Sequence, residues 1–225
     1  MAGIFKAYDV RGVVGQELSE ERAYWIGRAL AAEVFENKSP IVVTRDMRTH
    51  SPVLSEALVR GLSEGGCDVI DVGLAATPMN YWANNFYNAA GSVTVTASHN
   101  GPQYNGFKVS GPGATPRDFV TGLDRAEAFV LQAEGGHDEI VANKPGLVTQ
   151  AEGALEKYLD WMAQFVEPGD TKVRIAIDAA NGMAGSFLPH FAERIDWLEV
   201  VPLYWELDGT FPNHEADPLK AANLH

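Results

Sequence analysis

The hydrophobic pattern of this chain alternates between short apolar runs and longer amphipathic segments. The short runs have strand length and many β-branched residues, and they lie at 41–44, 67–72, 92–96, 173–178 and 198–204. The amphipathic segments repeat apolar residues every three or four positions, as helices do, and lie at about 19–36, 51–64, 77–87, 117–133, 151–166 and 184–194. Strands that alternate with helices in this way predict parallel sheets with right-handed crossovers.

A connector of low hydrophobicity divides this pattern at residues 134–146, which include Gly135-Gly136 and Pro145. Connectors of this composition are typical of domain boundaries. We therefore predict a first domain at 1–145 and a second at 146–225. The expected fold class is α/β, with two three-layer α/β/α domains that contain mixed or parallel sheets.

Local signals predict where several elements begin. Ser19 precedes two glutamates and is expected to cap its helix, and Ser51 is expected to cap the next one because Pro52 follows it. A short return strand is expected at 108–110. The aromatic residues of the 77–87 helix are predicted to lie in the core: Tyr81, Trp82 and Phe86.

The composition is that of a globular protein, with 46% hydrophobic and 21% charged residues. No apolar run approaches the length of about 18 residues that a membrane helix needs, and the first residues lack the layout of a secretory signal. The single cysteine, Cys67, excludes an internal disulfide and is expected to be a buried thiol. A cytoplasmic location is the simplest expectation.

The formal net charge of −13 argues against a general nucleic-acid or anionic-membrane surface. It leaves room for a small phosphorylated ligand, because several basic residues fall in or beside candidate functional loops. These residues are Lys6, Arg11, Arg45, Arg48 and Lys108. An acidic shell around a small basic site suits selective binding of an anion.

The most informative stretch runs from Thr96 to Lys108, directly after the strand at 92–96. It begins with small, polar and turn-forming residues, which hold side chains outside a packed layer. A hydroxyl, an imidazole and an ammonium stand within it, at Ser98, His99 and Lys108. Phosphorylated-serine chemistry needs this combination, although a polar turn without function has a similar composition.

Two other segments carry candidate anion contacts. Near the N-terminus, a turn that contains Tyr8 and Arg11 is predicted to place a phenol and a guanidinium on one side. Arginine matches the geometry of phosphate, but an N-terminal strand with a solvated arginine would explain the same residues. After the strand at 41–44, Arg48 is expected to brace its loop rather than bind a ligand.

These motifs together resemble a known family. Thr96-Ala-Ser-His-Asn and Tyr104-Asn-Gly-Phe-Lys resemble the phosphoserine loop of the α-D-phosphohexomutases, the phosphomannomutase/phosphoglucomutase enzymes and their relatives. The segment from Tyr8 to Gly12 is similar to the opening motif of that family. Further similarities lie at 45–48, 178–185 and 208–220. The resemblance spans essentially the whole chain, as the N-terminal half of such an enzyme.

The resemblance implies a mutase that moves phosphate between O1 and O6 of a hexose, mannose or glucose, through a hexose 1,6-bisphosphate. Ser98 would be the nucleophile and phosphoryl donor, and its phosphate would bind Mg²⁺. Lys108 would neutralise charge and carry the hydroxyl proton, and Arg11 would stabilise the phosphoryl oxygens. Tyr8, His99 and Asn100 would contact substrate or phosphate.

Parts of the family pattern are absent from this sequence. The aspartate loop of the family's metal site, Asp-Gly-Asp-x-Asp-Arg, does not occur, so the second domain is expected to be incomplete and the chain alone to have little activity. The spacing of His214, Glu215 and Asp217 fits no standard metal site. Gly101 stands where the family usually has proline, which predicts a more mobile loop.

Two alternative functions remain open at this point. One is the related phosphoglucosamine mutase, which acts on another sugar. The other is a non-enzymatic module that binds sugar phosphates.

Overall fold

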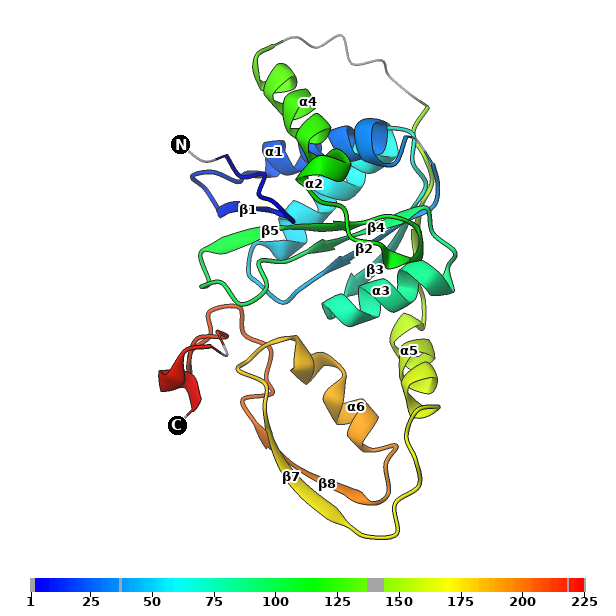
Figure 1. Cartoon of the computed structure of the whole chain (residues 1–225), viewed down its shortest axis with the longest axis vertical. Coiled ribbons are helices and arrows are strands. Elements are labelled where there is room, and N and C mark those ends of the chain that lie inside the picture. The colour runs from blue at the N-terminus through cyan, green and yellow to red at the C-terminus, as the bar shows by residue number, and fades with distance from the viewer. Residues whose placement is uncertain (1–2, 37, 137–143, 218, 225) are drawn as a thin grey trace.

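The computed structural model describes residues 3–36, 38–136, 144–217 and 219–224. Two units of structure follow each other along the chain (Figure 1). The first is built on a six-stranded sheet and the second on a two-stranded sheet. None of the helices in the described ranges combines the length and the apolar composition needed to cross a membrane.

The large sheet is mixed, with the strand order β1-β5-β4-β2-β3-β6. Its strands β4, β2, β3 and β6 run parallel, and β5 runs antiparallel to both β4 and β1. The strands are β1 (Val10–Val13), β2 (Ile41–Arg45), β3 (Val69–Leu74), β4 (Gly91–Val95), β5 (Tyr104–Ser110) and β6 (Val148–Gln150). The expected α/β class is confirmed.

Helices cover both faces of this sheet (Figure 1). One face carries α1 (Glu20–Ala29), which continues as the π-helix η1 (Leu30–Val34), together with α2 (Ser51–Glu64) and α4 (Asp124–Glu134). The other face carries α3 (Thr77–Phe86) and α5 (Ala154–Ala163). The first unit therefore has the predicted three layers.

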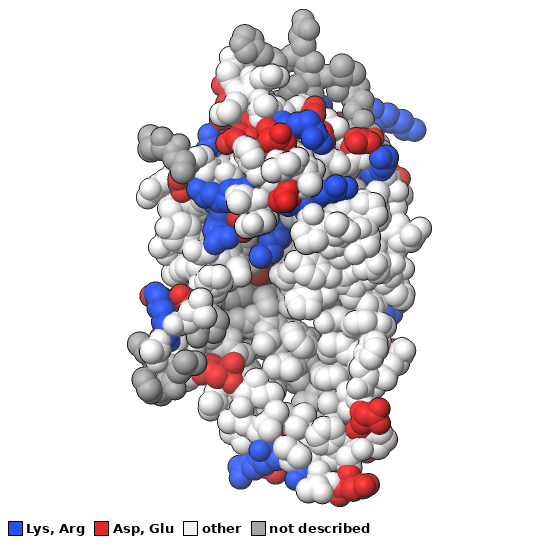
Figure 2. Space-filling model, viewed as in Figure 1, with Lys and Arg blue, Asp and Glu red and all other residues white. Residues whose placement is uncertain are grey.

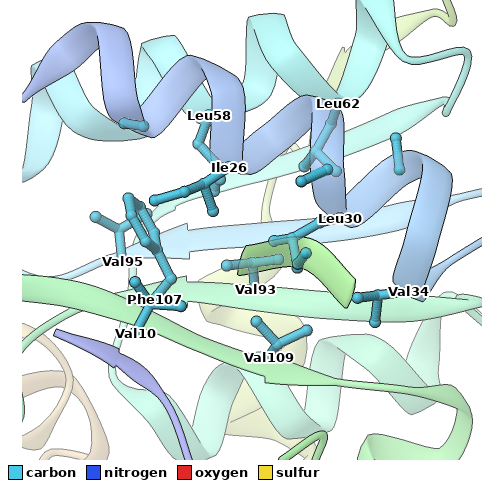
Figure 3. Close-up of a cluster of buried hydrophobic side chains, with 14 of the residues drawn as sticks. Val10, Ile26, Leu30, Val34, Leu58, Leu62, Val93, Val95, Phe107 and Val109 are labelled. Carbon is cyan, nitrogen blue, oxygen red and sulfur yellow. The ribbon is translucent and has the colours of Figure 1, made fainter. Parts of the chain in front are cut away.

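Two apolar clusters join these layers. In the larger cluster, Ile26 and Leu30 of the first helix meet Leu58 of α2 over the sheet residues Val93 and Phe107 (Figure 3). The smaller cluster lies on the opposite face and joins α3 and α5 to the sheet. Strand β2 contributes to both clusters, because Val43 points to one and Val42 to the other. This double burial explains why 41–44 is continuously apolar rather than alternating.

The second unit contains the predicted strand–helix–strand arrangement. Strands β7 (Val173–Asp178) and β8 (Leu198–Leu203) are parallel, and α6 (Leu188–Ala192) lies between them in the chain. The helix expected at 184–194 is shorter than predicted, because its first part is the 3-10 turn η4 (Met183–Ser186). The C-terminal 3-10 turn η5 (Ala221–Leu224) completes the described elements.

Several local predictions were wrong. Strand β5 begins at Tyr104 rather than at 108, because it pairs with β1 on one side and β4 on the other. The helix expected from 117 begins at Asp124, after the 3-10 turn η2 (Pro112–Ala114) and the π-helical turn η3 (Phe119–Leu123). Ser51 is the first residue of α2 and not its cap. Tyr81 and Phe86 are exposed, whereas Trp82 is buried as predicted.

The segment that joins the two units crosses the predicted boundary at 145/146. Strand β6, which follows that boundary, pairs with β3 at the edge of the first sheet. Helix α5 packs against α3, so it also lies against the first unit. Residues 137–143 lie outside the described residues, and the boundary position stays a prediction.

Candidate active site

The candidate site lies at the carboxyl ends of β2 and β4, which are parallel neighbours in the sheet. Loop 46–50 follows β2, and loop 96–103 follows β4. In open α/β sheets, ligands bind at this edge because neighbouring strands end there together and their loops project beyond the sheet. The two loops bring together the segments that the sequence singles out around Arg48 and Ser98.

Ser98 is exposed and has a left-handed backbone conformation, with φ = 57°. Its amide donates to the Thr96 hydroxyl at 2.9 Å, which fixes the turn at the end of β4. Its Oγ lies 3.3 Å from Nδ1 of His99. A left-handed conformation is costly for a non-glycine residue, so the surrounding contacts must hold the turn. The result is a serine hydroxyl presented outside the packed sheet.

Arg48 supplies the strongest of these contacts. Its side chain has no exposed surface, and its guanidinium donates to four carbonyl oxygens of the loop. These carbonyls belong to Ser98 (3.0 Å), Asn100 (2.6 Å), Gly101 (2.8 Å) and Tyr104 (3.1 Å). Arg48 therefore braces the serine loop. The prediction that it braces a loop is correct, but the loop is that of Ser98, about fifty positions away in sequence.

The charge of Arg48 is balanced by Asp46, which is buried beside it. The Asp46 carboxylate accepts from Nε of Arg48 at 3.1 Å, and it also accepts from the Ser51 hydroxyl at 2.5 Å. Asn105 of β5 donates to Ser51 at 2.9 Å and closes this network. Burial lowers the pKa of the Arg48 guanidinium, and the neighbouring Asp46 carboxylate opposes that change. The network ties the loop after β2, the start of α2 and the start of β5 into one rigid base.

Sequence reasoning missed the roles of Asp46, Ser51 and Asn105. The available signals were Arg45-Asp-Met-Arg directly after a buried strand, and Asn105 inside the Tyr-Asn-Gly-Phe-Lys motif. A buried polar side chain needs a hydrogen-bond partner, and here these three side chains and Arg48 bind one another.

A cleft of about 400 Å³ opens beside Ser98 and His99. Its walls come from both units, with Thr94 and Thr96 on the first and Gly182 and Met183 on the second among its lining residues. Figure 2 shows Lys and Arg side chains gathered on the first unit just above the region where the two units meet. A cleft between two units with an exposed hydroxyl in its wall is typical of a site that binds a small molecule.

Arg11 reaches the serine loop from β1. Its Nη1 donates to Oδ1 of Asn100 at 2.5 Å, and its Nη2 pairs with Asp9. Arg11 therefore stands in a strand and not in the expected turn, and it lies beside the serine loop. The Tyr8 side chain is 79% exposed, and its phenol forms no hydrogen bond within the described residues.

Lys108 lies in β5 and is opposite Thr94 of β4 in the register. Phe107 and Val109 on either side of it point into the larger apolar cluster, so Lys108 belongs to the opposite face, where Thr94 lines the cleft. Within the described residues its ammonium forms no hydrogen bond or ion pair. The structure thus leaves this cation available, but it does not place it against Ser98.

The second unit touches the site through residues 208–213. The ring of Phe211 lies over the Arg48 guanidinium, with 5.1 Å from Cζ to the ring centroid. Gly209 approaches the backbone so closely that a Cβ there would lie 2.7 Å from Cα of Arg48. Phe211 is buried and covers Arg48 from the side of the second unit. A family-like motif at 208–220 marked this segment, but its contact with Arg48 was not predictable.

Arg45 is separate from this site. It lines a different hollow of about 640 Å³, between α2 and the strands β3 and β6. Arg45 ends β2 directly before loop 46–50, beside a functional loop as expected, but its side chain does not line the Ser98 cleft. Its side chain turns to the α2 side of the sheet, whereas the Ser98 cleft lies elsewhere.

Within the described residues, no group of three or more His, Cys, Asp or Glu side chains is arranged to hold a metal ion. His214 instead contacts Asp178, with Nε2 3.0 Å from the carboxylate, and its Nδ1 lies 2.9 Å from the carbonyl of Glu215. The hydrogen bonds to the Glu215 carbonyl and to the Asp178 carboxylate raise the pKa of His214.

Comparison with known proteins shows which family the chain belongs to. The model of phosphoglucomutase/phosphomannomutase α/β/α domain I matches residues 2–121, and the model of domain II matches residues 156–225. The chain belongs to the phosphoglucomutase/phosphomannomutase family. The resemblance seen in the sequence is confirmed.

The relatives of this family member are longer proteins. It is 41% identical to a phosphomannomutase/phosphoglucomutase of Pseudomonas putida, over 98% of this chain and 46% of that protein. It is 39% identical to a phosphoglucomutase of Neisseria gonorrhoeae, again over 98% of this chain and 46% of the relative. The chain thus spans about half the length of the curated relatives it matches.

Solved structures agree with the fold. The crystal structure of a phosphoglucomutase/phosphomannomutase family protein from Burkholderia thailandensis matches with a TM-score of 0.83 and 32% identity, over 98% of this chain and 48% of that one. The structure of a putative phosphomannomutase from Thermus thermophilus matches with a TM-score of 0.78 and 23% identity, over 97% of this chain and 50% of that one, and supports the fold alone.

Proposed function

We propose that the protein is a phosphohexomutase that interconverts hexose 1-phosphate and hexose 6-phosphate, with mannose, glucose or both as the sugar. The observation that carries this proposal is the position of Ser98. Its hydroxyl stands in the wall of the cleft between the two units, on a loop that Arg48 holds rigid. The names of the Pseudomonas and Neisseria relatives support mannose and glucose phosphates as substrates.

The proposed reaction has two phosphoryl transfers through Ser98. In the first, the bond between phosphorus and Ser98 Oγ breaks as phosphorus bonds to the free hydroxyl oxygen of the sugar phosphate. The hydroxyl proton leaves the sugar, and Ser98 becomes a free hydroxyl. The hexose 1,6-bisphosphate then reorients, and its other phosphate returns to Ser98 with the reverse proton movement. Such transfers depend mainly on positioning and on neutralising the charge of the phosphoryl oxygens.

Residues of this chain supply both requirements in the proposal. Lys108 neutralises phosphoryl charge and carries the hydroxyl proton, and its ammonium has no other partner in the described part of the chain. Arg11 lies against the loop through Asn100 and contacts the transferring oxygens. His99, whose imidazole adjoins Ser98 Oγ, and Tyr8 act as phosphate or substrate contacts.

Mg²⁺ is the cofactor expected for the family, and it would neutralise charge on the Ser98 phosphate. The described residues do not supply the carboxylate ligands that such an ion needs, since no acidic cluster of that kind is present among them. The transfer steps above state only what the protein's own side chains contribute, and these side chains do not replace the metal. For the same reason, we expect little or no mutase turnover from the 225-residue chain by itself.

The test is substitution of Ser98 in the intact gene product that contains this chain. Ser98→Ala should abolish mutase turnover and remove phosphate from the protein. Ser39→Ala is the matched control, because Ser39 is also exposed but lies before β2, at the opposite end of the sheet. Normal turnover in Ser98→Ala would refute the proposal.

The two alternative functions predict different results. A phosphoglucosamine mutase would prefer the 1-phosphate of glucosamine over those of mannose and glucose, so rates on the three sugars decide between these enzymes. A binding module would carry no phosphate on Ser98, which an intact-mass measurement detects directly. A cytoplasmic location and the absence of nucleic-acid partners stay predictions.

A further inference from the structure

Arg48 holds the serine loop in place, and it also fixes the orientation of two peptide groups of that loop. A single nitrogen of its guanidinium, Nη2, donates to the carbonyl oxygens of both Ser98 (3.0 Å) and Asn100 (2.6 Å). Both carbonyls therefore converge on the buried base of the loop. The side chain of Arg48 is fully buried, so this orientation does not compete with solvent.

The opposite ends of these two peptide groups are amide N–H donors. In a planar trans peptide, the C=O and N–H bonds point in opposite directions. The N–H of His99 shares a peptide with the Ser98 carbonyl, and the N–H of Gly101 shares one with the Asn100 carbonyl. Both N–H groups thus point away from Arg48. Neither donates a hydrogen bond in the part of the chain that the structure describes, whereas Ser98 N and Asn100 N both do.

Outward-facing backbone amides contribute to anion-binding sites in many proteins, because each N–H carries a partial positive charge and needs an acceptor. The chemistry proposed for this loop offers one acceptor, a phosphoryl group on Ser98. Ser98 lies one residue before His99 and three residues before Gly101 in the chain. Hydrogen bonds from neutral donors to such an anion are short and strong.

We propose that the amides of His99 and Gly101 bind the phosphoryl group carried by Ser98, and that Arg48 is the positioning residue that turns them outward. This inference rests on the proposed function, in which Ser98 is phosphorylated. It assigns the phosphoryl oxygens two main-chain donors in addition to the side chains of Arg11 and Lys108.

The donor at Gly101 is a property of this particular chain. The phosphohexomutases usually have proline at this place, and proline has no N–H. Gly101 does not have a positive φ, so the backbone does not require glycine here. A Cβ at Gly101 would meet only the end of the Gln103 side chain, at 2.7 Å from Oε1. Gly101 can therefore be replaced by alanine, which keeps the amide N–H, or by proline, which removes it.

The contact from the second unit shields the Arg48 guanidinium from water. Phe211 lies over the Arg48 guanidinium, and Gly209 packs against the Arg48 backbone. Water that reached the guanidinium would compete for its donors and release the loop carbonyls.

The experiment compares the chain carrying phosphoserine at position 98, introduced by genetic encoding, with the same chain carrying serine. Amide proton shifts and amide exchange rates are measured by NMR at one fixed pH. We expect the His99 and Gly101 amide protons to move downfield on phosphorylation. Their exchange should slow by about tenfold or more, the level of a hydrogen bond to a charged group. The absence of any response at both amides would overturn the proposal.

Substitutions separate positioning from stability. In Arg48→Lys the charge remains but the planar fork is lost, so the response of both amides should disappear. Arg45→Lys is the control, since Arg45 lies three residues earlier and outside the site. A full response in folded Arg48→Lys would refute the role of Arg48.

Residue 101 provides a second series that leaves Arg48 intact. Gly101→Ala keeps the amide and should keep its response, whereas Gly101→Pro removes that donor and leaves the response of His99. Loss of the response in Gly101→Ala would contradict the proposal. Because phosphoserine is encoded, this experiment is independent of turnover: absence of natural phosphate on Ser98 would refute the mutase function and leave the amide result unchanged.

Discussion

The substitution Arg48→Met should strongly lower the stability of the first unit. Methionine fills much of the same volume but donates nothing. The Arg48 side chain is 0% exposed and that of Asp46 is 6% exposed, so the substitution leaves a buried carboxylate without its cation. It also leaves the carbonyls of Ser98 and Asn100 without the donor that they share.

The expected loss follows from these contacts. Removing one partner of a buried ion pair costs about 3–5 kcal/mol, because the remaining charge is desolvated and unpaired. The Ser51 hydroxyl and the Arg48 backbone amide still donate to Asp46 after the exchange, which limits the penalty to that range. We therefore expect the free energy of unfolding to fall by about 3–5 kcal/mol.

Urea denaturation followed by tryptophan fluorescence measures this change. Arg45→Met is the matched control, because Arg45 lies three residues before Arg48 and its side chain forms no hydrogen bond or ion pair among the described residues. Its exchange should change the free energy of unfolding by no more than about 0.5 kcal/mol. A loss below about 1 kcal/mol for Arg48→Met would refute the conclusion that Arg48 organises the serine loop.

Two further predictions concern titratable groups. Burial raises the pKa of Cys67 to about 11, so a thiol reagent at pH 8 should label the native protein very slowly and the urea-unfolded protein quickly. Rapid labelling of the native state would contradict the burial of this thiol. The carbonyl of Glu215 and the carboxylate of Asp178 raise the pKa of His214, so its stabilising effect is complete below the ordinary pKa of 6.5 and is lost as pH rises through the folded value. His214→Ala should therefore lower the thermal midpoint more at about pH 5 than at about pH 9, and an equal loss at both would show that its charge has no role.

The sequence allowed the architecture of the first unit to be predicted because its strands and helices are marked by local patterns. The run Ile41–Val43 is buried on both faces and reads as a central strand, and Ser19 caps α1 by accepting from the Arg22 amide at 3.1 Å, as expected. Strand β5 was misplaced because Asn105 and Gly106 are turn-forming residues. Only pairing with β1 and β4 on either side makes them strand.

The serine loop itself was predictable, but its support was not. Ser98, His99 and Asn100 form a recognisable local motif, and Arg11 indeed reaches Asn100. The contacts from Arg48 to the Ser98 loop join residues about fifty positions apart, and no local pattern encodes such a contact. The same reason explains why the packing of Phe211 on Arg48, between two units, appears only in the structure.

The exposed aromatics show a different limit. The spacing of Tyr81, Trp82 and Phe86 fits a helix whose apolar side is buried, and Trp82 is buried as expected. Phe86 instead stacks on Trp82 from outside, with 4.6 Å between ring centroids, and stays 52% exposed. Periodicity alone gave the helix but not which of its aromatic residues face the core.

The central claim is that Ser98 carries a phosphoryl group during turnover. The most direct measurement is phosphopeptide mass spectrometry on the intact gene product after incubation with hexose 1,6-bisphosphate. The account predicts one phosphate on Ser98, its transfer to added hexose phosphate, and no phosphate in Ser98→Ala, while Ser39→Ala behaves like the unsubstituted protein. Turnover of hexose phosphate with Ser98 unphosphorylated throughout, or with the phosphate on another residue, would contradict it.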